Sequence, residues 1–216
     1  MTRKLLIVCV ALLFFSLGAV AQQQTIEKRS EIPFAFKEFK DAKVLQPFGR
    51  YVKAKANIML KNAALCYTEN GKILQAYAKG ILGVEFDSVK YMKVDSLAMG
   101  KVIASKNYNY LVCVTTIDMD QYKQETHGDE NLPFFNIEEL GTFLNLENDP
   151  RNMKTGYPLK DTYYFIARGQ VIPAMESKFK KAVRPERKSD FKKLMGDRFW
   201  SWKDEKSLTQ LLDFLP

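Results

Sequence analysis

The chain has 216 residues, and its 33 Lys and Arg outnumber its 25 Asp and Glu to give a formal net charge of +8. A protein of this size buries roughly 70% of its unfolded surface, so its core needs no disulfide or metal. His127 is the only histidine, which excludes a metal centre with two imidazole ligands and limits any Ser-His or Cys-His catalysis to this residue. The common nucleophile, zinc and phosphate-loop motifs are absent from the sequence. The sequence therefore indicates no cofactor.

Residues 1–21 have the layout of a cleavable secretory signal peptide. Arg3 and Lys4 precede an apolar run from Leu5 to Leu17, and Ala19-Val20-Ala21 forms a small-x-small cleavage site. The apolar run is too short to cross a hydrocarbon core of about 30 Å as a helix. The sequence therefore predicts a soluble protein that is exported to the periplasm or secreted and has no transmembrane segment after processing.

The predicted mature chain, residues 22–216, is assigned to one domain and retains two cysteines, Cys66 and Cys113. An even number of cysteines in an oxidising compartment favours a disulfide. Each of the two lies in an apolar, strand-like run, however, where a free cysteine behaves as a small hydrophobic residue. A Cys66–Cys113 disulfide and a pair of buried thiols are therefore both retained as alternatives.

Apolar runs alternate with turn signals from residue 51 to residue 117, which predicts a strand-rich region. It is preceded by Glu31–Phe48, whose phenylalanines and prolines predict a cover for one end of the sheet without a long regular element. Asn70-Gly71 predicts a tight hairpin turn, since both residues tolerate positive φ. The alternation from Tyr51 to Ile58 predicts a half-buried strand. Its buried face comprises Val52, Ala54, Ala56 and Ile58, and its other face comprises Tyr51, Lys53, Lys55 and Asn57.

Further strands are predicted at Lys72–Ala78, Ile81–Phe86, Val89–Val94, Leu97–Ala104 and Tyr108–Ile117. The last of these is almost wholly apolar or β-branched, which is typical of a central strand that is covered on both faces. The polar segment Asp118–Pro133 that follows is predicted to be a surface loop.

Residues 134–216 mix helical and strand patterns. Asn136 and Glu139 predict the start of a helix that ends before Pro150. Tyr163–Ala174 has strand character and aligns with Leu65–Ala76 through its glycine, its apolar pairs and its final alanine. Either a duplicated unit or the shared chemistry of two glycine turns explains this similarity.

The C-terminal residues predict short helices. Met175, Phe179 and Val183 recur at helical spacing until Pro185, and a second helix is predicted to be capped by Ser189 and to end before Gly196. A third is predicted to start after Ser201, with Leu208, Leu211, Leu212 and Leu215 as its apolar stripe. The order of elements predicts an α+β fold, mainly an antiparallel β-sheet meander with helices packed to one side.

Four carboxylates near the histidine are candidates for chemistry, namely Asp118, Asp120, Asp129 and Glu130. Two carboxylates at a suitable separation could hydrolyse a glycosidic bond, and acidic neighbours such as Glu125 could tune His127. Such carboxylates are common in exported proteins, and an exposed acidic segment is usually only a solvated loop.

Eight basic residues gather near the C-terminus, and they are candidates for binding an anionic ligand: Lys178, Lys180, Lys181, Arg184, Arg187, Lys188, Lys192 and Lys193. With only two acidic residues between them, they supply the whole net charge of +6 that the predicted mature chain carries. Anionic surfaces and acidic glycans fit this patch, whereas nucleic acid is not expected for an exported protein; a solvated helix face is the alternative. Trp200 and Trp202 form an aromatic cluster that either stacks on a sugar or fixes the last helix to the body.

We therefore expect a non-catalytic binding or structural module that is exported. A carboxylate-based hydrolase directed at glycans and a carrier of a lipid-like ligand are the alternatives. An enzyme requires titratable groups that converge in a pocket, whereas an interaction module requires an exposed basic or apolar patch.

Overall fold

The structure is a computed structural model that describes residues 27–77, 79–126 and 156–216. The predicted signal peptide, His127, Asp129, Glu130 and the helix predicted to start at Asn136 lie outside these residues. None of the helices in the described ranges has the length and apolar character needed to span a bilayer.

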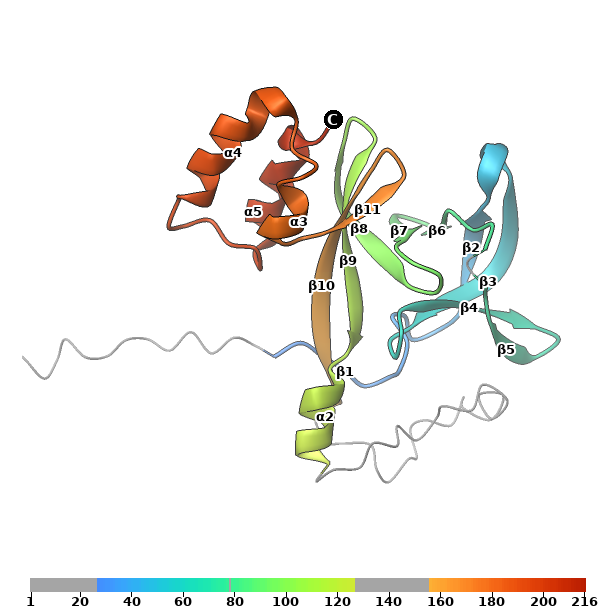
Figure 1. Cartoon of the computed structure of the whole chain (residues 1–216). Coiled ribbons are helices and arrows are strands. Elements are labelled where there is room, and N and C mark those ends of the chain that lie inside the picture. Colours follow the sequence, from blue (N-terminus) through green and yellow to red (C-terminus); the bar gives the residue numbers. More distant parts are fainter. Residues whose placement is uncertain (1–26, 78, 127–155) are drawn as a thin grey trace, which may run out of the picture.

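An antiparallel sheet forms the body of the molecule, which confirms the predicted α+β fold with a mainly antiparallel meander (Figure 1). Its strands are β1 (Arg29–Ser30), β2 (Lys40–Leu45), β3 (Tyr51–Met59), β4 (Ala64–Glu69), β5 (Lys72–Gln75), β6 (Gly83–Phe86), β7 (Val89–Lys93), β8 (Met99–Lys106), β9 (Asn109–Ile117), β10 (Tyr157–Ala167) and β11 (Gln170–Pro173). They pair in the order β1-β10-β9-β8-β7-β6-β2-β3-β4-β5, and β11 also pairs with β10. The five strands predicted between Lys72 and Ile117 are all present, with ends that differ by at most three residues, whereas β10 begins six residues before the predicted Tyr163.

β2 was not expected from the sequence, and it determines how the sheet is connected. It pairs with β3 along its whole length and with β6 at Lys43–Leu45. β2 therefore joins two meanders, β3–β5 and β6–β10, which would otherwise lie next to each other without a shared strand. Only Ala42 and Val44 of this strand are buried, so its apolar pattern is too short to stand out from the flanking lysines.

β3 departs from the alternation predicted for it at both ends. Val52 was expected on the buried face and is 50% exposed; it lies in the part of β3 that has no neighbour on the β4 side, because β4 pairs with β3 only at Ala56–Met59. Asn57 was expected on the exposed face but is 1% exposed. Its side-chain amide donates to the carbonyls of Phe36 and Glu38 and accepts from the backbone N–H of Phe36. The buried amide is satisfied by the N-terminal segment, which the alternation pattern could not reveal.

β9 is covered on both faces, as predicted. Its four consecutive residues from Leu111 to Val114 are buried, and it pairs along both edges with β8 and β10. It stands third from the β1 end of the sheet, so it is an interior strand without being the middle one.

The two hairpins that the sequence aligned have the same turn geometry. Asn70 and Gly71 have φ values of 49° and 75°, and Arg168 and Gly169 have 49° and 74°. The next hydrogen bonds also correspond, because Ala76 N donates to Leu65 O as Ala174 N donates to Tyr163 O. Left-handed φ at both turn residues is typical of two-residue hairpins, so this likeness does not decide between duplication and shared turn chemistry.

Short helices surround the β9–β10 hairpin at its two ends: α2 (Met119–Glu125), α3 (Glu176–Phe179), α4 (Lys188–Met195) and α5 (Glu205–Gln210), with 3-10 turns η1 (Pro47–Gly49), η3 (Pro185–Arg187) and η4 (Leu211–Phe214). α3, α4 and α5 form a layer against one end of β9, β10 and β11, whereas α2 lies at the other end (Figure 1). This arrangement separates a helical end of the molecule from the end where β1 meets β10.

Three predictions about helix starts are wrong. Asp118–Pro133 is not all loop, because the Asp118 carboxylate accepts from the N–H groups of Asp120 and Gln121 and starts α2. α4 begins at Lys188, without a capping bond from the predicted Ser189. Asp204 rather than Ser201 caps α5, since its carboxylate accepts from Ser207 N at 2.8 Å. In each case an aspartate or the preceding turn determines the start.

The leucine stripe of the last helix is confirmed. Leu208, Leu211, Leu212 and Leu215 are buried against β9, β10 and β11 together with Phe165 and Phe179. A second buried cluster fills the space between the two meanders, and it includes Ile58, Leu65, Val84, Phe86 and Met99. The helical layer is therefore an integral part of the fold.

Candidate functional site

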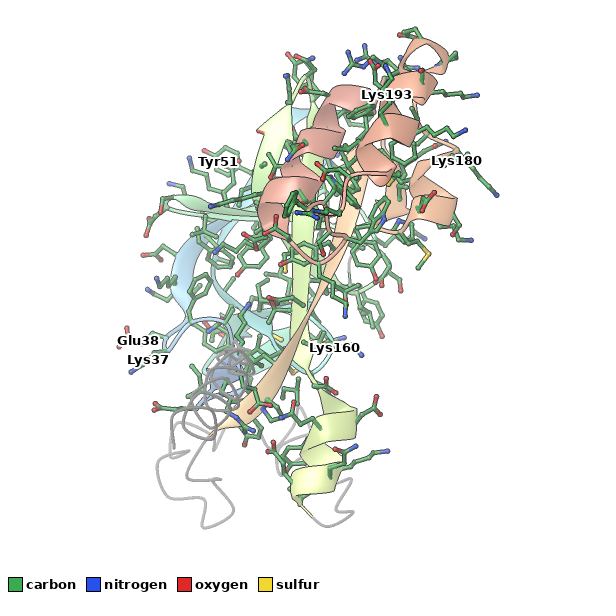
Figure 2. The ribbon with its side chains drawn as sticks, turned by 90° about the vertical axis from the view of Figure 1, so that its left-hand side faces the viewer. Lys37, Glu38, Tyr51, Lys160, Lys180 and Lys193 are labelled. Atoms are coloured by element: carbon green, nitrogen blue, oxygen red, sulfur yellow. The ribbon has the colours of Figure 1, made fainter. Side chains whose placement is uncertain are left out.

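Six lysines form an exposed face on the helical layer, and we call them the lysine face: Lys178, Lys180, Lys181, Lys188, Lys192 and Lys193. They come from α3, the turn after it and α4. Figure 2 shows Lys180 and Lys193 at the outside of this layer. The interleaved Phe179, Val183 and Phe191 are buried, whereas all six lysines are exposed.

Arg184 and Arg187, the other two residues of the predicted basic patch, are half-buried and bind the C-terminus. Arg184 donates from Nη2 to the Asp213 carbonyl at 2.6 Å and from its backbone N–H to the Phe214 carbonyl at 3.0 Å. The Arg187 guanidinium lies 5.0 Å from the centre of the Phe214 ring. These two arginines fix η4 against the helices, and the lysine face is the part of the patch that is open to a ligand.

Carboxylates neutralise little of the lysine face. Asp190 is 4.0 Å from Lys193 Nζ and 3.7 Å from Arg187, while Glu186 is 3.8 Å from Arg184. Among the residues that the structure describes, no other lysine of the face has an ion pair. Like charges that are held on one surface raise the local positive potential, so this face attracts anions.

Trp200 and Trp202 lie between α4 and α5 in the chain and are half-buried. Their rings meet edge to face with centroids 4.7 Å apart, and Trp202 contacts Phe179 in the same way at 6.1 Å. Both pack on the cluster beneath α5. This packing favours the role of fixing the last helix over that of a flat sugar platform.

A polar belt crosses β9 and β10 between their apolar ends, and it consists of Cys113, Thr115, Asp161 and Tyr163. Asp161 lies opposite Thr115 in the register, and Tyr163 lies opposite Cys113, so the four side chains share one face. Thr115 Oγ1 donates to Asp161 at 2.5 Å, and Lys28 Nζ binds the same carboxylate at 2.8 Å. At the helical end of the belt, the Tyr163 hydroxyl donates to Glu205 at 3.2 Å.

The pKa shifts in the belt indicate a structural role. Burial raises the pKa of the Cys113 thiol to about 12, so this thiol stays protonated at neutral pH and is not an activated nucleophile. Burial also acts to raise the pKa of Asp161, but hydrogen bonds from Lys28 and Thr115 outweigh it and lower that pKa. Asp161 is therefore an ion-paired carboxylate and not a general acid.

Both cysteines are free, buried thiols in this structure. Cys66 is on β4 and packs with Phe34, Met59 and Ile73, and its burial raises its pKa to about 12. Cys113 is on β9, which does not pair with β4. The structure thus corresponds to the alternative with two buried thiols.

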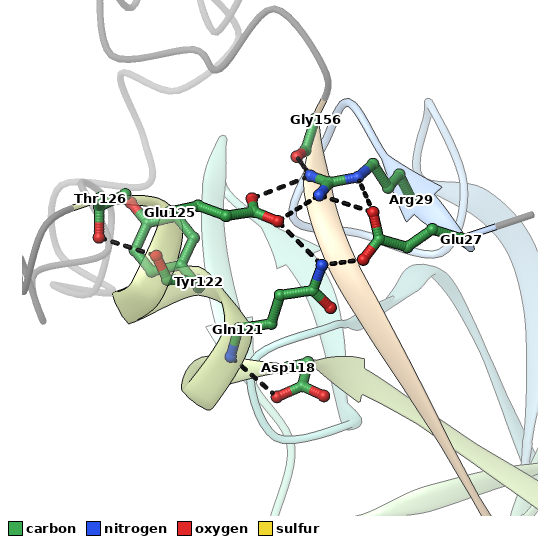
Figure 3. Close-up of polar contacts among 8 residues, drawn as sticks. All are labelled: Glu27, Arg29, Asp118, Gln121, Tyr122, Glu125, Thr126 and Gly156. Atoms are coloured by element: carbon green, nitrogen blue, oxygen red, sulfur yellow. Dashed lines mark hydrogen bonds and ion pairs between the residues drawn. The ribbon is translucent and has the colours of Figure 1, made fainter.

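A second polar network holds α2 to the segment before β1, and we call it the Arg29 network (Figure 3). The Arg29 guanidinium binds Glu125 through two nitrogens, Glu27 at 2.8 Å and the Gly156 carbonyl at 2.8 Å. Gln121 also donates to Glu125, at 2.8 Å. The hydrogen bonds that Arg29 donates to Glu125 lower the pKa of Glu125 and raise the pKa of Arg29. Each formally charged side chain of this network thus has a partner of opposite charge within the protein.

The carboxylates proposed for hydrolysis do not form a site in the described part of the chain. Asp118 caps α2, and Asp120 lies in the first turn of the same helix. No group of three or more His, Cys, Asp or Glu within residues 27–77, 79–126 and 156–216 is placed to hold a metal. The geometry thus gives no support to chemistry by Asp118 and Asp120.

A surface hollow of about 500 Å³ lies on β2, β3 and β6, away from all these residues, and it is lined by Asp41, Ala42, Lys43, Lys53, Ala54, Glu85 and Asp87. Two of its carboxylates are paired with lysines, Asp41 with Lys55 at 3.4 Å and Glu85 with Lys90 at 3.1 Å. A hollow with this polar lining does not suit a lipid-like ligand.

The sequence indicated the lysine face but not the Arg29 network or the polar belt. Arg29 and Glu125 are far apart in the chain and follow no local pattern, so only the folded structure brings them together. Comparison with protein-family models, curated proteins and solved structures found no match to this chain.

Proposed function

We propose that this protein is an exported, non-catalytic binding module that attaches to polyanionic surfaces through the lysine face. The observation that carries the proposal is the set of six exposed lysines on one helical layer; among the described residues, only Lys193 of this set has a carboxylate within 4.0 Å. Export follows from the predicted signal peptide at 1–21.

Electrostatics supports a surface rather than a single small anion as the ligand. A lysine close to an anionic lipid surface contributes about 1 kcal/mol to binding, and this attraction decays within a Debye length of about 8 Å at physiological salt. The hollow of about 500 Å³ lies on β2, β3 and β6 and is not lined by any lysine of the lysine face. Several weak attractions that act together therefore give useful affinity only for a ligand with repeated negative charges, such as anionic headgroups or an acidic glycan.

The rigidity of the helical layer also supports the proposal. Phe179 contacts Phe165, Phe191 and Trp202 with ring centroids 4.7 to 6.1 Å apart. The lysines therefore project from a surface that is packed on the sheet, and binding does not require the backbone to order first. A catalytic role has less support, because Cys113 and Asp161 are held in the protonation states that a structural role requires.

A matched pair of triple variants tests the proposal. K180Q/K188Q/K193Q removes half of the lysine face, whereas K37Q/K72Q/K160Q removes three exposed lysines elsewhere and changes the net charge equally. Figure 2 shows that Lys37 and Lys160 lie well apart from Lys180 and Lys193. Co-sedimentation with anionic and neutral vesicles and binding to dextran sulfate are measured across salt concentrations.

We expect wild-type protein to bind both polyanions, more weakly as salt rises, and not to bind neutral vesicles. The lysine-face variant should lose about a hundredfold in affinity, from about 1 kcal/mol for each lysine, while the control triple changes little. Equal losses of affinity in both variants would mean that net charge, and not the lysine face, determines binding. Binding to neither polyanion at low salt would refute it.

A further inference from the structure

The two most exposed large apolar side chains of the described residues are aromatic, and each lies at the end of a hairpin. Phe48 is 93% exposed in η1, between β2 and β3, and Tyr108 is 90% exposed in the turn between β8 and β9. We call these two residues the aromatic tips. An aromatic ring that is left in water loses the burial free energy that it would gain in a core, so two such rings at hairpin ends call for an explanation.

Both aromatic tips have a backbone conformation that disfavours them. The φ values are 63° for Phe48 and 62° for Tyr108, in the left-handed region where residues with a side chain are strained. Two other two-residue turns of the sheet also have left-handed φ at both residues, and they have glycine at the position of Tyr108, namely Gly71 and Gly169. The fold therefore accepts glycine in such turns, and the aromatic residue at 108 contributes no contact that would offset the strain. An outlier of this kind indicates selection for something other than stability.

The aromatic tips lie at the helical end of the molecule. In Figure 1 the blue η1 turn, the green β8–β9 turn and the orange β10–β11 turn all point toward the upper end, where α4 also lies. Figure 2 is turned about the vertical axis and shows Lys180 and Lys193 at that upper end as well. The lysine face and both aromatic tips thus lie toward the upper end of the molecule, with η1 on the side away from α4.

Cations accompany the tips. Arg50 is exposed two residues after Phe48, and Arg168 is exposed in the β10–β11 turn. Lys106, at the end of β8, forms an ion pair with Asp213. Aromatic rings next to exposed Arg and Lys are the combination that favours the interface of an anionic bilayer, because the ring enters the headgroup region while the cations bind phosphates.

We infer that this end of the protein docks on an anionic lipid bilayer, with Phe48 and Tyr108 inserted among the headgroups and the lysine face above them. This inference rests on the proposed function and selects lipid over acidic glycan as the polyanion. A soluble glycan would use the lysines but not two separate aromatic tips. A protein partner would need a contiguous apolar patch, whereas the tips are isolated on two hairpins that the lysines accompany.

The double variant F48G/Y108G tests the inference without damaging the fold. Glycine relieves the strain at both positions and gives the β8–β9 turn the favourable sequence Asn-Gly, so its unfolding midpoint should equal or exceed that of wild type. Y77S is the control, because Tyr77 is 86% exposed and follows β5. Anionic vesicles and dextran sulfate are the two probes.

We expect F48G/Y108G to bind anionic vesicles at least tenfold more weakly and dextran sulfate as wild type does, since the burial of one aromatic ring alone is worth about a factor of ten. Y77S should match wild type with both probes. The inference would be overturned if F48G/Y108G bound vesicles as wild type does or had a lowered unfolding midpoint. It would also be overturned if the wild-type protein bound dextran sulfate but not anionic vesicles. The last result would leave the proposed function intact, whereas binding to neither probe would refute both.

A direct readout of insertion comes from a dye whose emission depends on polarity. F48C and Y77C are labelled in turn, and the buried Cys66 and Cys113 are shielded from the reagent. Anionic vesicles should shift the emission of the dye at position 48 to shorter wavelength and leave that at position 77 unchanged. A bound protein with no shift at position 48 would overturn insertion.

Discussion

The two ends of the paired strands β9 and β10 differ in what their charged residues contact. At the end with β1 and α2, Arg29 is bound by Glu27, Glu125 and the Gly156 carbonyl, and its side chain is only 19% exposed. At the helical end, the lysines of the lysine face are exposed, and carboxylates neutralise almost none of their charge. Charge that is satisfied within the fold contributes to stability, whereas charge left to solvent is available to a ligand.

Apolar residues show the same contrast. Near α2, Tyr122 and Tyr157 are buried with their rings 6.1 Å apart. At the helical end, Phe48 and Tyr108 are almost fully exposed. The helical end nevertheless has the larger buried cluster beneath it. Its outward-facing residues are therefore not a sign of a loose structure, and mutations can separate the packing of this end from its surface.

The largest effect should come from Phe179→Ala, which removes the ring that joins the helical layer to the sheet. Phe179 is fully buried and contacts Phe165, Phe191 and Trp202. We expect the free energy of unfolding to fall by about 3–5 kcal/mol, as is usual for a buried Phe→Ala change. Urea denaturation followed by tryptophan fluorescence measures it. A loss below about 1 kcal/mol would mean that the helical layer is not packed as described.

Arg29→Ala should have the next largest effect, and it acts at the opposite end. The change leaves the partly buried Glu125 without its main partner, so we expect a loss of about 1–2 kcal/mol at pH 7. Arg29 lowers the pKa of Glu125 in the folded state. The contribution of the Arg29–Glu125 pair to stability is therefore present above the ordinary glutamate pKa of about 4.3. It is lost as the pH falls through the lower pKa that Glu125 has in the folded state.

The difference in stability between wild type and Arg29→Ala should accordingly shrink below about pH 4. Lys55→Ala is the control, because the Lys55–Asp41 pair is exposed and should contribute less than about 0.5 kcal/mol at any pH. Equal effects of the two changes at pH 7 would show that the Arg29 network is only a surface contact.

Local patterns predicted the fold where one strand or turn carries its own signal. Asn70-Gly71, the apolar run of β9 and the leucine stripe of α5 and η4 are each a short-range property of the sequence, and each is present in the structure. β2 carried too few apolar residues to be recognised, although it joins the two meanders. Asn57 was predicted to be exposed because it lies on the polar side of the alternation in β3. It is buried instead, since the backbone at Phe36 and Glu38 forms hydrogen bonds with its side-chain amide.

The candidate site divides in the same way. The clustering of lysines is visible in the sequence, but the separation of six exposed lysines from the structural Arg184 and Arg187 depends on the position of η4. Phe48 gave no local signal, because the sequence did not predict β2 and hence not the turn between β2 and β3 in which Phe48 lies. Tyr108 did give one, since a two-residue turn that starts with asparagine usually continues with glycine.

The smallest effect should come from Tyr163→Phe, at the point where the polar belt meets the helical end. This change removes only the hydroxyl that donates to Glu205 at 3.2 Å and keeps the ring in place. We expect a loss of about 0.5–1 kcal/mol near pH 7. A double-mutant cycle with Glu205→Gln isolates the contribution of this hydrogen bond, and no coupling would mean that the hydroxyl is solvated instead.

The same variant has a second signature at alkaline pH. Burial raises the pKa of Tyr163, and the nearby Cys113 and Glu205 act in the same direction. A raised pKa means that the folded state favours the protonated phenol. The contribution of this phenol to stability is therefore complete below the ordinary tyrosine pKa of about 10 and is lost as the pH rises through the higher pKa of the folded state. Wild type should therefore lose stability faster than Tyr163→Phe above pH 10, whereas parallel curves would place the hydroxyl in water. In that case α5 would depend on its leucines alone for its attachment to β10, and the polar belt would end at Asp161.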